Sequence, residues 1–378
     1  MAEATQPGPD SRAIVITEIE QFGGAERSVL ALARWLHRRN LAVHVVTYED
    51  RCGLGGFATH PLPVVELKAQ GTRRRVAALR EYFRRRGHTA PKPLLSGYQP
   101  ALHATLAGLR GFHDLMHDTP SLFAGSGERD LDRRLRRWVS NRIVARGLRS
   151  GGATVVTSEF LREECRRDFG IEAHIVRMGG MSNPADHFRI RTVAPGEPLR
   201  MLSVCRIESN KRIDWILRSL ADLERADPPL SARTNWRLDL AGKGPLLGEL
   251  GALAEELGIG ERVQFHGFVA DDALQDLYDR AHLFLMPAVQ GYGIPAIESL
   301  ERGIPAVLHR ESGVSDILLA TPWATVFTGG PESLTSALEG AIGRVLGGAH
   351  HEHPLPAIPT EDAWAEQVAR LCGWVPQP

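Results

Sequence analysis

The sequence predicts an α/β protein with two doubly wound domains, each built on a parallel sheet. Apolar runs typical of buried strands alternate with amphipathic helical stretches along the whole chain. At 378 residues, the chain is also longer than one hydrophobic core usually serves. Its net charge is zero, but the charges are unevenly distributed. Residues 1–190 hold 29 Lys and Arg and 20 Asp and Glu, whereas residues 191–378 hold 16 Lys and Arg and 25 Asp and Glu. The basic half suits an anionic partner.

The first half opens with a unit typical of a parallel sheet. A buried strand, a Gly-rich loop, an amphipathic helix and a second strand are predicted at 13–19, 21–26, 27–40 and 41–50. An arginine-rich helix at 72–87, a strand edge that leads into a loop at 108–114, a second arginine-rich helix at 129–149 and a strand at 153–158 should follow in this order. The stretch 174–180 closes this half. Residues 178–198, rich in Gly, Pro and Asn, read as an interdomain linker.

The second half repeats the alternation. Strands are predicted at 200–207, 236–241, 262–269, 282–288 and 306–310. Helices are predicted at 213–224, 246–258, 271–281, 294–302 and 362–375. We therefore expect an N-terminal domain over 1–180 and a C-terminal domain over 198–357, with a final helix within 360–376 that packs back on the first domain.

Composition excludes several classes of protein. The chain is 43% hydrophobic and 24% charged, which is ordinary for a soluble globular protein. It has no apolar run of 18 residues and no apolar segment near its start, so neither a transmembrane helix nor a signal peptide is expected. Its four cysteines lack CxxC spacing, which argues against a zinc site and suits a reducing compartment. We expect a cytoplasmic protein.

Several loops that follow predicted strands carry groups suited to one anionic ligand. In open α/β sheets, ligands bind at the carboxyl ends of strands, where the topology switches. Gly23 and Gly24 precede one helix, and the Gly-rich stretch 291–294 precedes another, so both helix starts can offer backbone N–H groups to a phosphate. Arg206 and Lys211 follow a third strand and suit a diphosphate. Each feature alone is more often a simple connector, but together they favour a nucleotide site.

These residues resemble a family. The stretches SVCRIESNKRIDWIL, LAGKGPLLGEL, VQFHGFV and LYDRAHLFLMPAVQGYGIPAIESLERGIPAV, together with GGAERSVLALARWL, are similar in order and spacing to retaining GT-B glycosyltransferases of the family 4 type. The resemblance covers about residues 12–375. It implies a GT-B fold, in which two Rossmann-like doubly wound domains face a cleft. It also implies that the N-terminal domain binds the acceptor and the C-terminal domain binds a nucleotide-sugar donor.

The resemblance also implies residue roles. Arg206 and Lys211 would stabilise the leaving diphosphate, and His113 would lie near the reacting face of the sugar, with His117 as the alternative. Glu298, in the first turns of its helix, would hold the ribose hydroxyls. The remaining donor-binding residues would be Gly23, Gly24, Gly242, Phe268, Val269, Gln290, Gly291, Tyr292, Gly293 and Ile294. No metal and no cofactor are implied, since arginine, lysine and helix starts can take the charge. We interpret Asp130 and Asp132 as ion-pairing residues of a helix.

One position departs from the family pattern. The family usually has two glutamates separated by seven residues, whereas this chain has Gln290 and Glu298. A glutamine can hydrogen-bond a sugar hydroxyl but cannot supply negative charge. Either Gln290 recognises the donor sugar, or the chain has lost much of its activity. The second reading corresponds to a nucleotide-sugar-binding protein with little or no turnover. A nucleotide-sugar epimerase on the same fold is a further alternative, although the sequence offers no convincing acid–base pair for it.

The acceptor is less well defined by the sequence. A glycan, a lipid-linked sugar or a small molecule is compatible with the resemblance, in polysaccharide or glycoside biosynthesis. The arginine-rich helices at 72–87 and 129–149 suit peripheral contact with anionic lipid at the inner face of a membrane, or equally a solvated surface. Nucleic acid is not expected, because no aromatic stacking platform accompanies the basic residues. The sequence does not fix the base and sugar of the donor, and we expect a GDP- or UDP-hexose.

Overall fold

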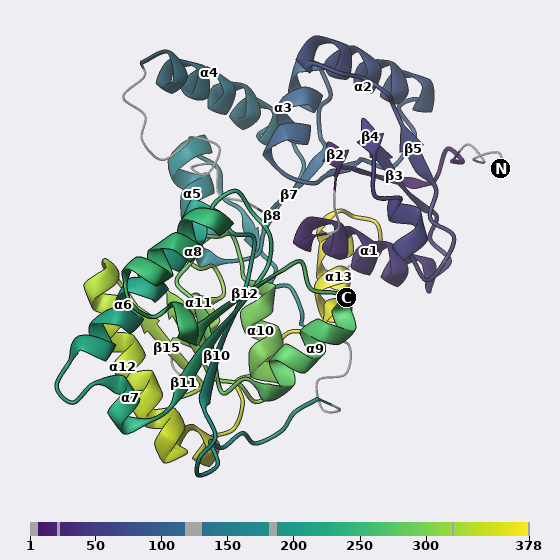
Figure 1. The fold of residues 1–378 in the computed structure, drawn as a ribbon. Helices are drawn as coiled ribbons and strands as arrows, with labels where there is room; N and C mark the ends of the chain where they lie inside the picture. Colours follow the sequence, from purple (N-terminus) through teal and green to yellow (C-terminus); the bar gives the residue numbers. More distant parts are fainter. Residues whose placement is uncertain (1–6, 21–22, 118–130, 181–186, 320, 377–378) are drawn as a thin grey trace. The chain divides into compact units, whose positions relative to one another are not determined.

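The structure, a computed structural model, describes residues 7–20, 23–117, 131–180, 187–319 and 321–376. It divides into two compact units, Met1–Gly179 with Pro359–Pro378 and Gly180–Ile358, here called the N-terminal and C-terminal units. Each unit contains one large parallel sheet with helices packed on it (Figure 1). The predicted fold class of two doubly wound α/β units is confirmed.

The N-terminal unit has a seven-stranded parallel sheet in the order β5-β3-β1-β6-β7-β8-β9. Its strands are β1 (Arg12–Val15), β3 (Val43–Thr47), β5 (Val64–Glu66), β6 (Leu94–Leu95), β7 (His113–Met116), β8 (Thr154–Val156) and β9 (His174–Ile175). The short strands β2 (Glu18–Ile19) and β4 (Glu49–Asp50) pair separately. Its helices are α1 (Gly24–His37), α2 (Thr72–Arg86), α3 (Tyr98–Leu106), α4 (Leu131–Leu148), α5 (Glu159–Phe169) and α13 (Glu361–Leu371), with a 3₁₀ turn at Leu54–Phe57.

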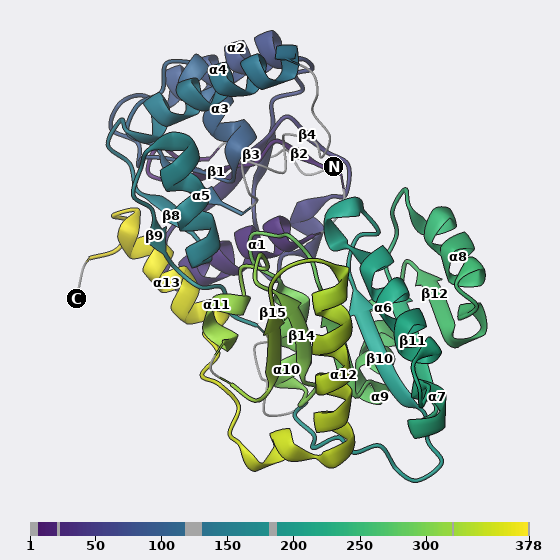
Figure 2. The same cartoon turned by 90° about the vertical axis from the view of Figure 1, so that its left-hand side faces the viewer.

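The last helix belongs to the N-terminal unit although it follows the C-terminal unit in sequence (Figure 2). Arg34 of α1 forms an ion pair with Glu361 of α13 at 2.5 Å, and Arg27 donates to the same carboxylate at 3.2 Å. Trp364 of α13 is fully buried. Gly179 lies so close that a Cβ there would stand 2.1 Å from the backbone nitrogen of Glu361. The final helix is therefore held by both charge and packing.

The C-terminal unit has a six-stranded parallel sheet in the order β12-β11-β10-β13-β14-β15. Its strands are β10 (Leu199–Val204), β11 (Trp236–Ala241), β12 (Val263–Gly267), β13 (Leu283–Met286), β14 (Ala306–His309) and β15 (Ala324–Phe327). Its helices are α6 (Ile213–Arg225), α7 (Leu230–Arg233), α8 (Leu247–Glu256), α9 (Asp271–Arg280), α10 (Ile294–Glu301), α11 (Ser315–Leu318) and α12 (Pro331–Gly347). Short 3₁₀ turns lie at Ser209–Lys211, Gly260–Arg262 and Ala349–Glu352.

The strand order of the C-terminal unit fixes where a ligand can bind. From β10 the sheet grows in one direction through β11 and β12, and in the other through β13, β14 and β15. The loops that leave β10 and β13 therefore turn to opposite faces and open a crevice at their carboxyl ends. The core beneath is formed by strand residues such as Met201 and Leu285 and by the apolar faces of α6, α8 and α12. This packed core supports the strands that border the crevice.

Local structure at 108–114 differs from the expectation. The segment was predicted to be a strand edge that reaches a loop, but the strand begins at His113 and continues to Met116. Gly108 and Gly111 have positive φ angles of 85° and 73°, so they form the turn that precedes β7. The glycines thus mark the entrance of the strand and not its exit, and the loop at its carboxyl end starts at His117.

Candidate functional site

The carboxyl edge of the C-terminal sheet brings together the predicted residues of that unit. Arg206 and Lys211 follow β10, Gly242 follows β11, and Phe268 and Val269 follow β12. The Gly-rich loop after β13 carries Gln290, Gly291, Tyr292 and Gly293 and runs into α10, whose first residue is Ile294. Because every strand in this sheet is parallel, these loops all lie along one edge.

Three side-chain and backbone links connect the β10 loop to the loops after β13 and β14. Asn210 and Val289 exchange two hydrogen bonds, one from the backbone N–H of Val289 at 2.8 Å and one from the Asn210 amide at 3.1 Å. Lys211 Nζ donates to Gln290 Oε1 at 2.7 Å. Arg212 forms an ion pair with Glu311 at 2.6 Å. The two sides of the switch point therefore form one connected structure.

Both the side-chain amide and the backbone of Gln290 form hydrogen bonds. Its Nε2 group donates to Ser312 Oγ at 3.2 Å and to Met286 Sδ at 2.8 Å, while its Oε1 accepts from Lys211. Its backbone N–H and C=O bond to Glu311 and Gly313. The sequence pointed to Gln290 but missed Asn210 and Ser312, although the position of Ser312 just beyond the strand at 306–310 was a usable signal.

Two glycines at this edge occupy positions that no other residue fits. Gly242 has a φ of 143°, and a Cβ there would stand 1.8 Å from the carbonyl oxygen of Cys205. Gly293 has a φ of 126°, and its Cβ would lie 2.7 Å from Gln290 Nε2. Both glycines allow the backbone to approach a neighbouring loop closely while φ is positive. Gly293 also ends the loop at the N-terminus of α10, where Ile294 carries the first backbone N–H of the helix, Pro295 has none and the N–H of Ala296 donates to the carbonyl of Gly293 at 3.1 Å.

Glu298 lies in the first turns of its helix, as predicted. It is the fifth residue of α10 and therefore belongs to the second turn. Its carboxylate accepts a hydrogen bond from the Tyr278 hydroxyl at 3.2 Å. The half-buried carboxylate is thus oriented by a neighbour on α9 and remains suited to accept hydrogen bonds from a diol.

The remaining predicted residues of this edge are more exposed. Arg206 is paired with Glu208 at 3.0 Å, and more than half of its side-chain surface is exposed. Phe268 has 71% of its surface exposed, and the Lys243 ammonium lies 5.2 Å from the centre of its ring. An exposed aromatic ring beside a flexible cation offers a flat apolar surface with positive charge next to it, which suits a heteroaromatic base carrying phosphates.

In the N-terminal unit, Gly23 caps α1 and Gly24 is its first residue, so the helix begins three residues earlier than the predicted start at residue 27. The Gly23 N–H donates to the carboxylate of Glu26 at 3.0 Å. A carboxylate of the chain itself therefore takes one of the donors at this helix start. The role of the two glycines in donor binding stays a prediction.

The predicted position of His113 at the end of a strand is wrong. His113 is the first residue of β7, at the amino edge of the sheet, and its Nδ1 accepts a hydrogen bond from the backbone of Ala153 at 3.1 Å. Burial, together with the charge of Lys92, lowers the pKa of His113 to about 4. Ligands bind at the opposite edge of such sheets. His113 is therefore a buried neutral histidine of the core.

His117, the alternative, directly follows β7 at the carboxyl edge. Its Nε2 lies 3.3 Å from the hydroxyl of Ser28 on α1. Ser28 in turn donates its hydrogen to the carbonyl of Ala25 at 2.7 Å, so its oxygen can only accept from the histidine. This arrangement places the proton of neutral His117 on Nε2.

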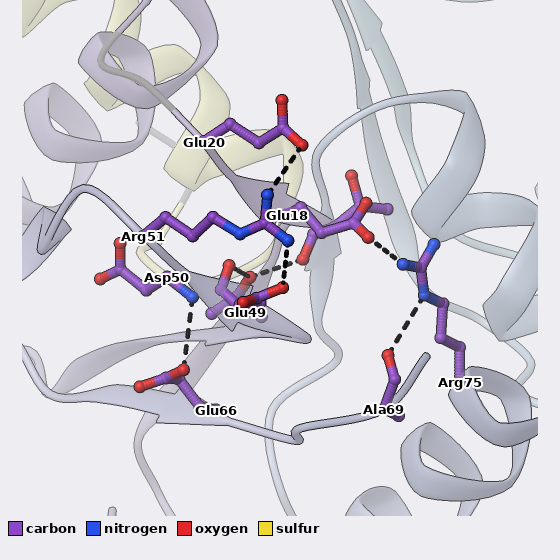
Figure 3. A network of polar contacts seen from close by, with 10 residues as sticks. Glu18, Glu20, Glu49, Asp50, Arg51, Glu66, Ala69 and Arg75 are labelled. Carbon is purple, nitrogen blue, oxygen red and sulfur yellow. Dashed lines mark hydrogen bonds and ion pairs between the residues drawn. The ribbon is translucent and has the colours of Figure 1, made fainter. Parts of the chain in front are cut away.

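A network of carboxylates and arginines also lies beyond β1 and β3 (Figure 3). Arg75 of α2 pairs with Glu18 of β2, and Arg51 bonds to Glu49 of β4 at 2.9 Å. Arg75 also donates to the carbonyl of Ala69 at 3.3 Å. This arginine of the basic helix therefore fixes the small β2–β4 sheet against α2.

The two basic helices differ in their exposed faces. In α2, the guanidinium groups of Arg84 and Arg85 are both bonded to Glu81, so part of its charge is compensated. In α4, three apolar side chains are exposed: Leu135 by 60%, Trp138 by 55% and Val139 by 44%. These residues are spaced i, i+3 and i+4 and therefore share one face of the helix.

Three further features concern metal ions, disulfides and membrane-spanning helices. No group of three or more metal-ligating side chains occurs in the described part of the chain. Asp130 and the side chain of Asp132 lie outside the described residues. All four cysteines are free. Within the described ranges, none of the helices has the length and hydropathy needed to cross a membrane.

Two family models match the chain in succession. The model described as Glycosyltransferase Family 4 matches residues 22–179, and the model described as Glycosyl transferases group 1 matches residues 185–341. Together they cover most of both units.

Comparison with individual proteins gives the same picture. An uncharacterized glycosyltransferase from Methanocaldococcus jannaschii is 32% identical over 119 residues, which are 31% of this chain and 29% of that protein. A GDP-mannose-dependent alpha-(1-6)-phosphatidylinositol monomannoside mannosyltransferase from Mycolicibacterium smegmatis is 29% identical over 157 residues, 39% of each chain. The matches thus span less than half the length of these relatives.

Among solved structures, HepE from Anabaena in complex with UDP superposes with a TM-score of 0.73 at 15% identity, over 96% of this chain and 100% of that chain. This similarity shows a shared fold.

Proposed function

This chain belongs to the GT-B glycosyltransferases of the family 4 type, and from that premise we propose that it transfers a hexose from a nucleoside-diphosphate sugar to an acceptor hydroxyl, with retention at the anomeric carbon. The observation that carries the proposal is that Arg206, Lys211 and the Gly-rich start of α10 lie on the loops that follow β10 and β13, on either side of the switch point. This edge combines two cations with a helix N-terminus, which is the chemistry that a leaving diphosphate requires.

Each group has a distinct part in the proposed reaction. Arg206 and Lys211 stabilise the negative charge that grows on the diphosphate as the glycosidic bond breaks. Glu298, oriented by Tyr278, accepts hydrogen bonds from the ribose hydroxyls. Phe268 and Val269 border the base. Because the protein's own cations and helix start supply positive charge, the proposed reaction needs no metal ion and no cofactor.

For the N-terminal unit we propose that His117, and not His113, lies near the reacting sugar. His117 is at the carboxyl edge of its sheet, and Ser28 orients its ring. Gly23 and Gly24 remain the proposed contacts of this unit with the donor.

The relatives favour two donor classes. The mycolicibacterial relative is named for GDP-mannose, and HepE was solved with UDP. We therefore propose a GDP- or UDP-hexose as donor and a glycan, a lipid-linked sugar or a small molecule as acceptor.

We also propose peripheral contact with an anionic membrane surface through α4. Its exposed Trp138 and Leu135 are accompanied by the exposed arginines Arg136 and Arg142, and the Arg142 guanidinium lies 4.7 Å from the centre of the Trp138 ring. An apolar helix face flanked by arginines complements the boundary between headgroups and acyl chains.

A thermal-shift screen against UDP, GDP, dTDP and ADP tests the donor site. A nucleotide that binds only the folded protein raises the Tm by mass action. We expect one of them to raise the Tm of the wild type, and Arg206→Ala to abolish that shift. Arg225→Ala is the matched control, because Arg225 pairs with Asp222 on α6 and not at the strand ends. No shift with any nucleotide in a well-folded sample would overturn the assignment.

Turnover separates the enzyme from the alternative of a binding protein. Once the nucleotide is known, we expect the corresponding nucleotide sugar to be consumed in the presence of candidate acceptors. Donor binding without any transfer or hydrolysis would favour a binding protein, and conversion of the donor sugar without an acceptor would favour an epimerase.

A further inference from the structure

The orientation of the Gln290 amide is fixed by the chemistry of its neighbours. Lys211 Nζ carries three hydrogens and no acceptor, so the atom that faces it at 2.7 Å must be the amide oxygen. The amide NH₂ group then faces Ser312 Oγ at 3.2 Å and Met286 Sδ at 2.8 Å. Only this orientation of the amide satisfies Lys211, because the reverse would place NH₂ against the ammonium.

Ser312 requires a donor at position 290. Its hydroxyl donates its single hydrogen to the carbonyl oxygen of Tyr292 at 3.1 Å. The oxygen therefore presents only lone pairs to Gln290, and the sulfur of Met286 is likewise a weak acceptor. Ser312 is completely buried, so water does not replace a missing donor. The pocket around the end of this side chain is thus built for an amide.

We propose that Gln290 is a positioning residue whose neutral amide holds the Lys211 ammonium at the switch point, and that Ser312 and Met286 select the amide over a carboxylate. The inference rests on the proposed function, in which Lys211 binds the donor diphosphate. It answers whether the glutamine is a sign of lost activity: the neighbouring residues match the amide, so the position is adapted to it.

A carboxylate at position 290 has two unfavourable effects. One oxygen places a full negative charge 2.7 Å from Nζ, where it competes with the diphosphate for the lysine. The other oxygen faces Ser312 and Met286, so an acceptor meets acceptors in a buried position. The first effect weakens binding of a ligand that carries phosphates, and the second adds to it by driving the carboxylate away from Ser312 and toward Lys211, so both effects depend on those phosphates.

The test is nucleotide binding by Gln290→Glu, Gln290→Met and wild type, measured by titration calorimetry. The probes are the nucleoside diphosphate that the wild type binds best among UDP, GDP, dTDP and ADP, and its nucleoside without phosphates. We expect Gln290→Glu to lower the affinity for the diphosphate by about tenfold or more, which corresponds to the loss of one charged contact. Gln290→Met is uncharged and of similar length, so we expect it to lower this affinity less. The affinity for the nucleoside should change little in either variant.

Ser312→Ala provides the second arm. Without the hydroxyl, a carboxylate at position 290 no longer faces the serine lone pairs. We therefore expect the ratio of diphosphate affinities between Gln and Glu at position 290 to shrink by about threefold or more in the Ser312→Ala background. The Tm of each variant verifies that it is folded.

The outcomes separate the two proposals. A wild type that binds no nucleotide overturns the proposed function itself. If the wild type binds but Gln290→Glu binds the diphosphate as tightly or turns over faster, the positioning role is wrong and the glutamine reflects lost activity. An equal loss of affinity for the nucleoside and the diphosphate would also contradict the positioning role, because a purely structural defect weakens binding of both ligands alike.

Discussion

His117 lies 3.3 Å from Ser28, measured from ring Nε2 to hydroxyl Oγ. The contact joins the residue after β7 to the second turn of α1, and the two residues are 89 positions apart in the chain. Because the serine gives its hydrogen to Ala25, it fixes the ring as an Nε2–H tautomer. The ring of His113 is oriented too, by the backbone N–H of Ala153 that donates to its Nδ1, but it lies buried at the start of β7.

The first prediction concerns these two histidines. We expect His117→Ala to lower kcat by about 100-fold while donor binding is retained, because a positioned group near the reacting atoms contributes about that much. The measurement is steady-state turnover of the donor identified by nucleotide binding. His113→Gln is the matched control and should keep its kcat at neutral pH. A loss of kcat in the control but not in His117→Ala would reverse the assignment.

The second prediction concerns Glu298 and the ribose. If its carboxylate accepts the ribose hydroxyls, Glu298→Gln should weaken nucleoside-diphosphate binding by about 10-fold to 100-fold, the strength of a hydrogen bond to a charged group. The measurement is calorimetric titration of both proteins with the nucleotide and with its 2′-deoxy and 3′-deoxy analogues. At least one deoxy analogue should bind the wild type and Glu298→Gln almost equally. If the loss of affinity caused by the mutation simply adds to the loss caused by each deoxy substitution, Glu298 contacts another part of the ligand.

The third prediction concerns the backbone at Gly242. A Cβ at this residue would stand 1.8 Å from the carbonyl oxygen of Cys205, so one of the two loops must shift. We expect Gly242→Ala to lower the stability of the C-terminal unit by about 2–4 kcal/mol, the range for strained sites. Gly251→Ala is the control: it lies within α8 with no atom within 4 Å of its Cβ, and should be neutral or stabilising. Calorimetric unfolding decides between them.

The fourth prediction is a loss of stability in mild acid. Burial and a nearby cation lower the pKa of His113 to about 4 and that of His44 to about 3, whereas an unfolded histidine titrates near 6.5. The unfolded chain therefore binds protons first, and the stability contributed by each neutral histidine is complete above pH 6.5 and is lost as the pH falls toward 4.

At pH 5 this amounts to about 2 kcal/mol for each histidine. The check is the Tm of the wild type and of His113→Gln at pH 7 and pH 5. The variant should lose less of its Tm between the two pH values than the wild type does. An identical loss would show that His113 is protonated in the folded protein.

The fifth prediction concerns α4 and lipid. We expect the protein to sediment with vesicles that contain anionic lipid and not with neutral vesicles, because arginine side chains near an anionic surface each contribute about 1 kcal/mol. Trp138→Ala should reduce the bound fraction several-fold. Arg84→Ala is the control, since Arg84 is bonded to Glu81 on α2. Binding that is unaffected by Trp138→Ala, or absent with anionic vesicles, would contradict the contact.

Much of the architecture could be predicted because it follows from local patterns. Buried strands such as 283–286 are continuous apolar runs, and helices such as 213–225 place their apolar residues on one face. Alternation of the two implies parallel sheets with ligand loops at one edge. The same reasoning selected Arg206, Lys211 and the loop at 290–294, and the structure has these residues at the carboxyl edge of their sheet. Their roles stay predictions.

What the sequence alone determined is therefore the fold class and the set of loops that carry the candidate site, because both depend on periodicity and on residue types that are neighbours in the chain. The tertiary structure alone decided which histidine stands at the correct edge, since that depends on where β7 begins, and which atoms surround Gln290, since Lys211 and Ser312 come from two other loops. Hydrogen bonds between segments distant in sequence leave no pattern along the chain, so their partners emerge only when the sheet order brings the loops together.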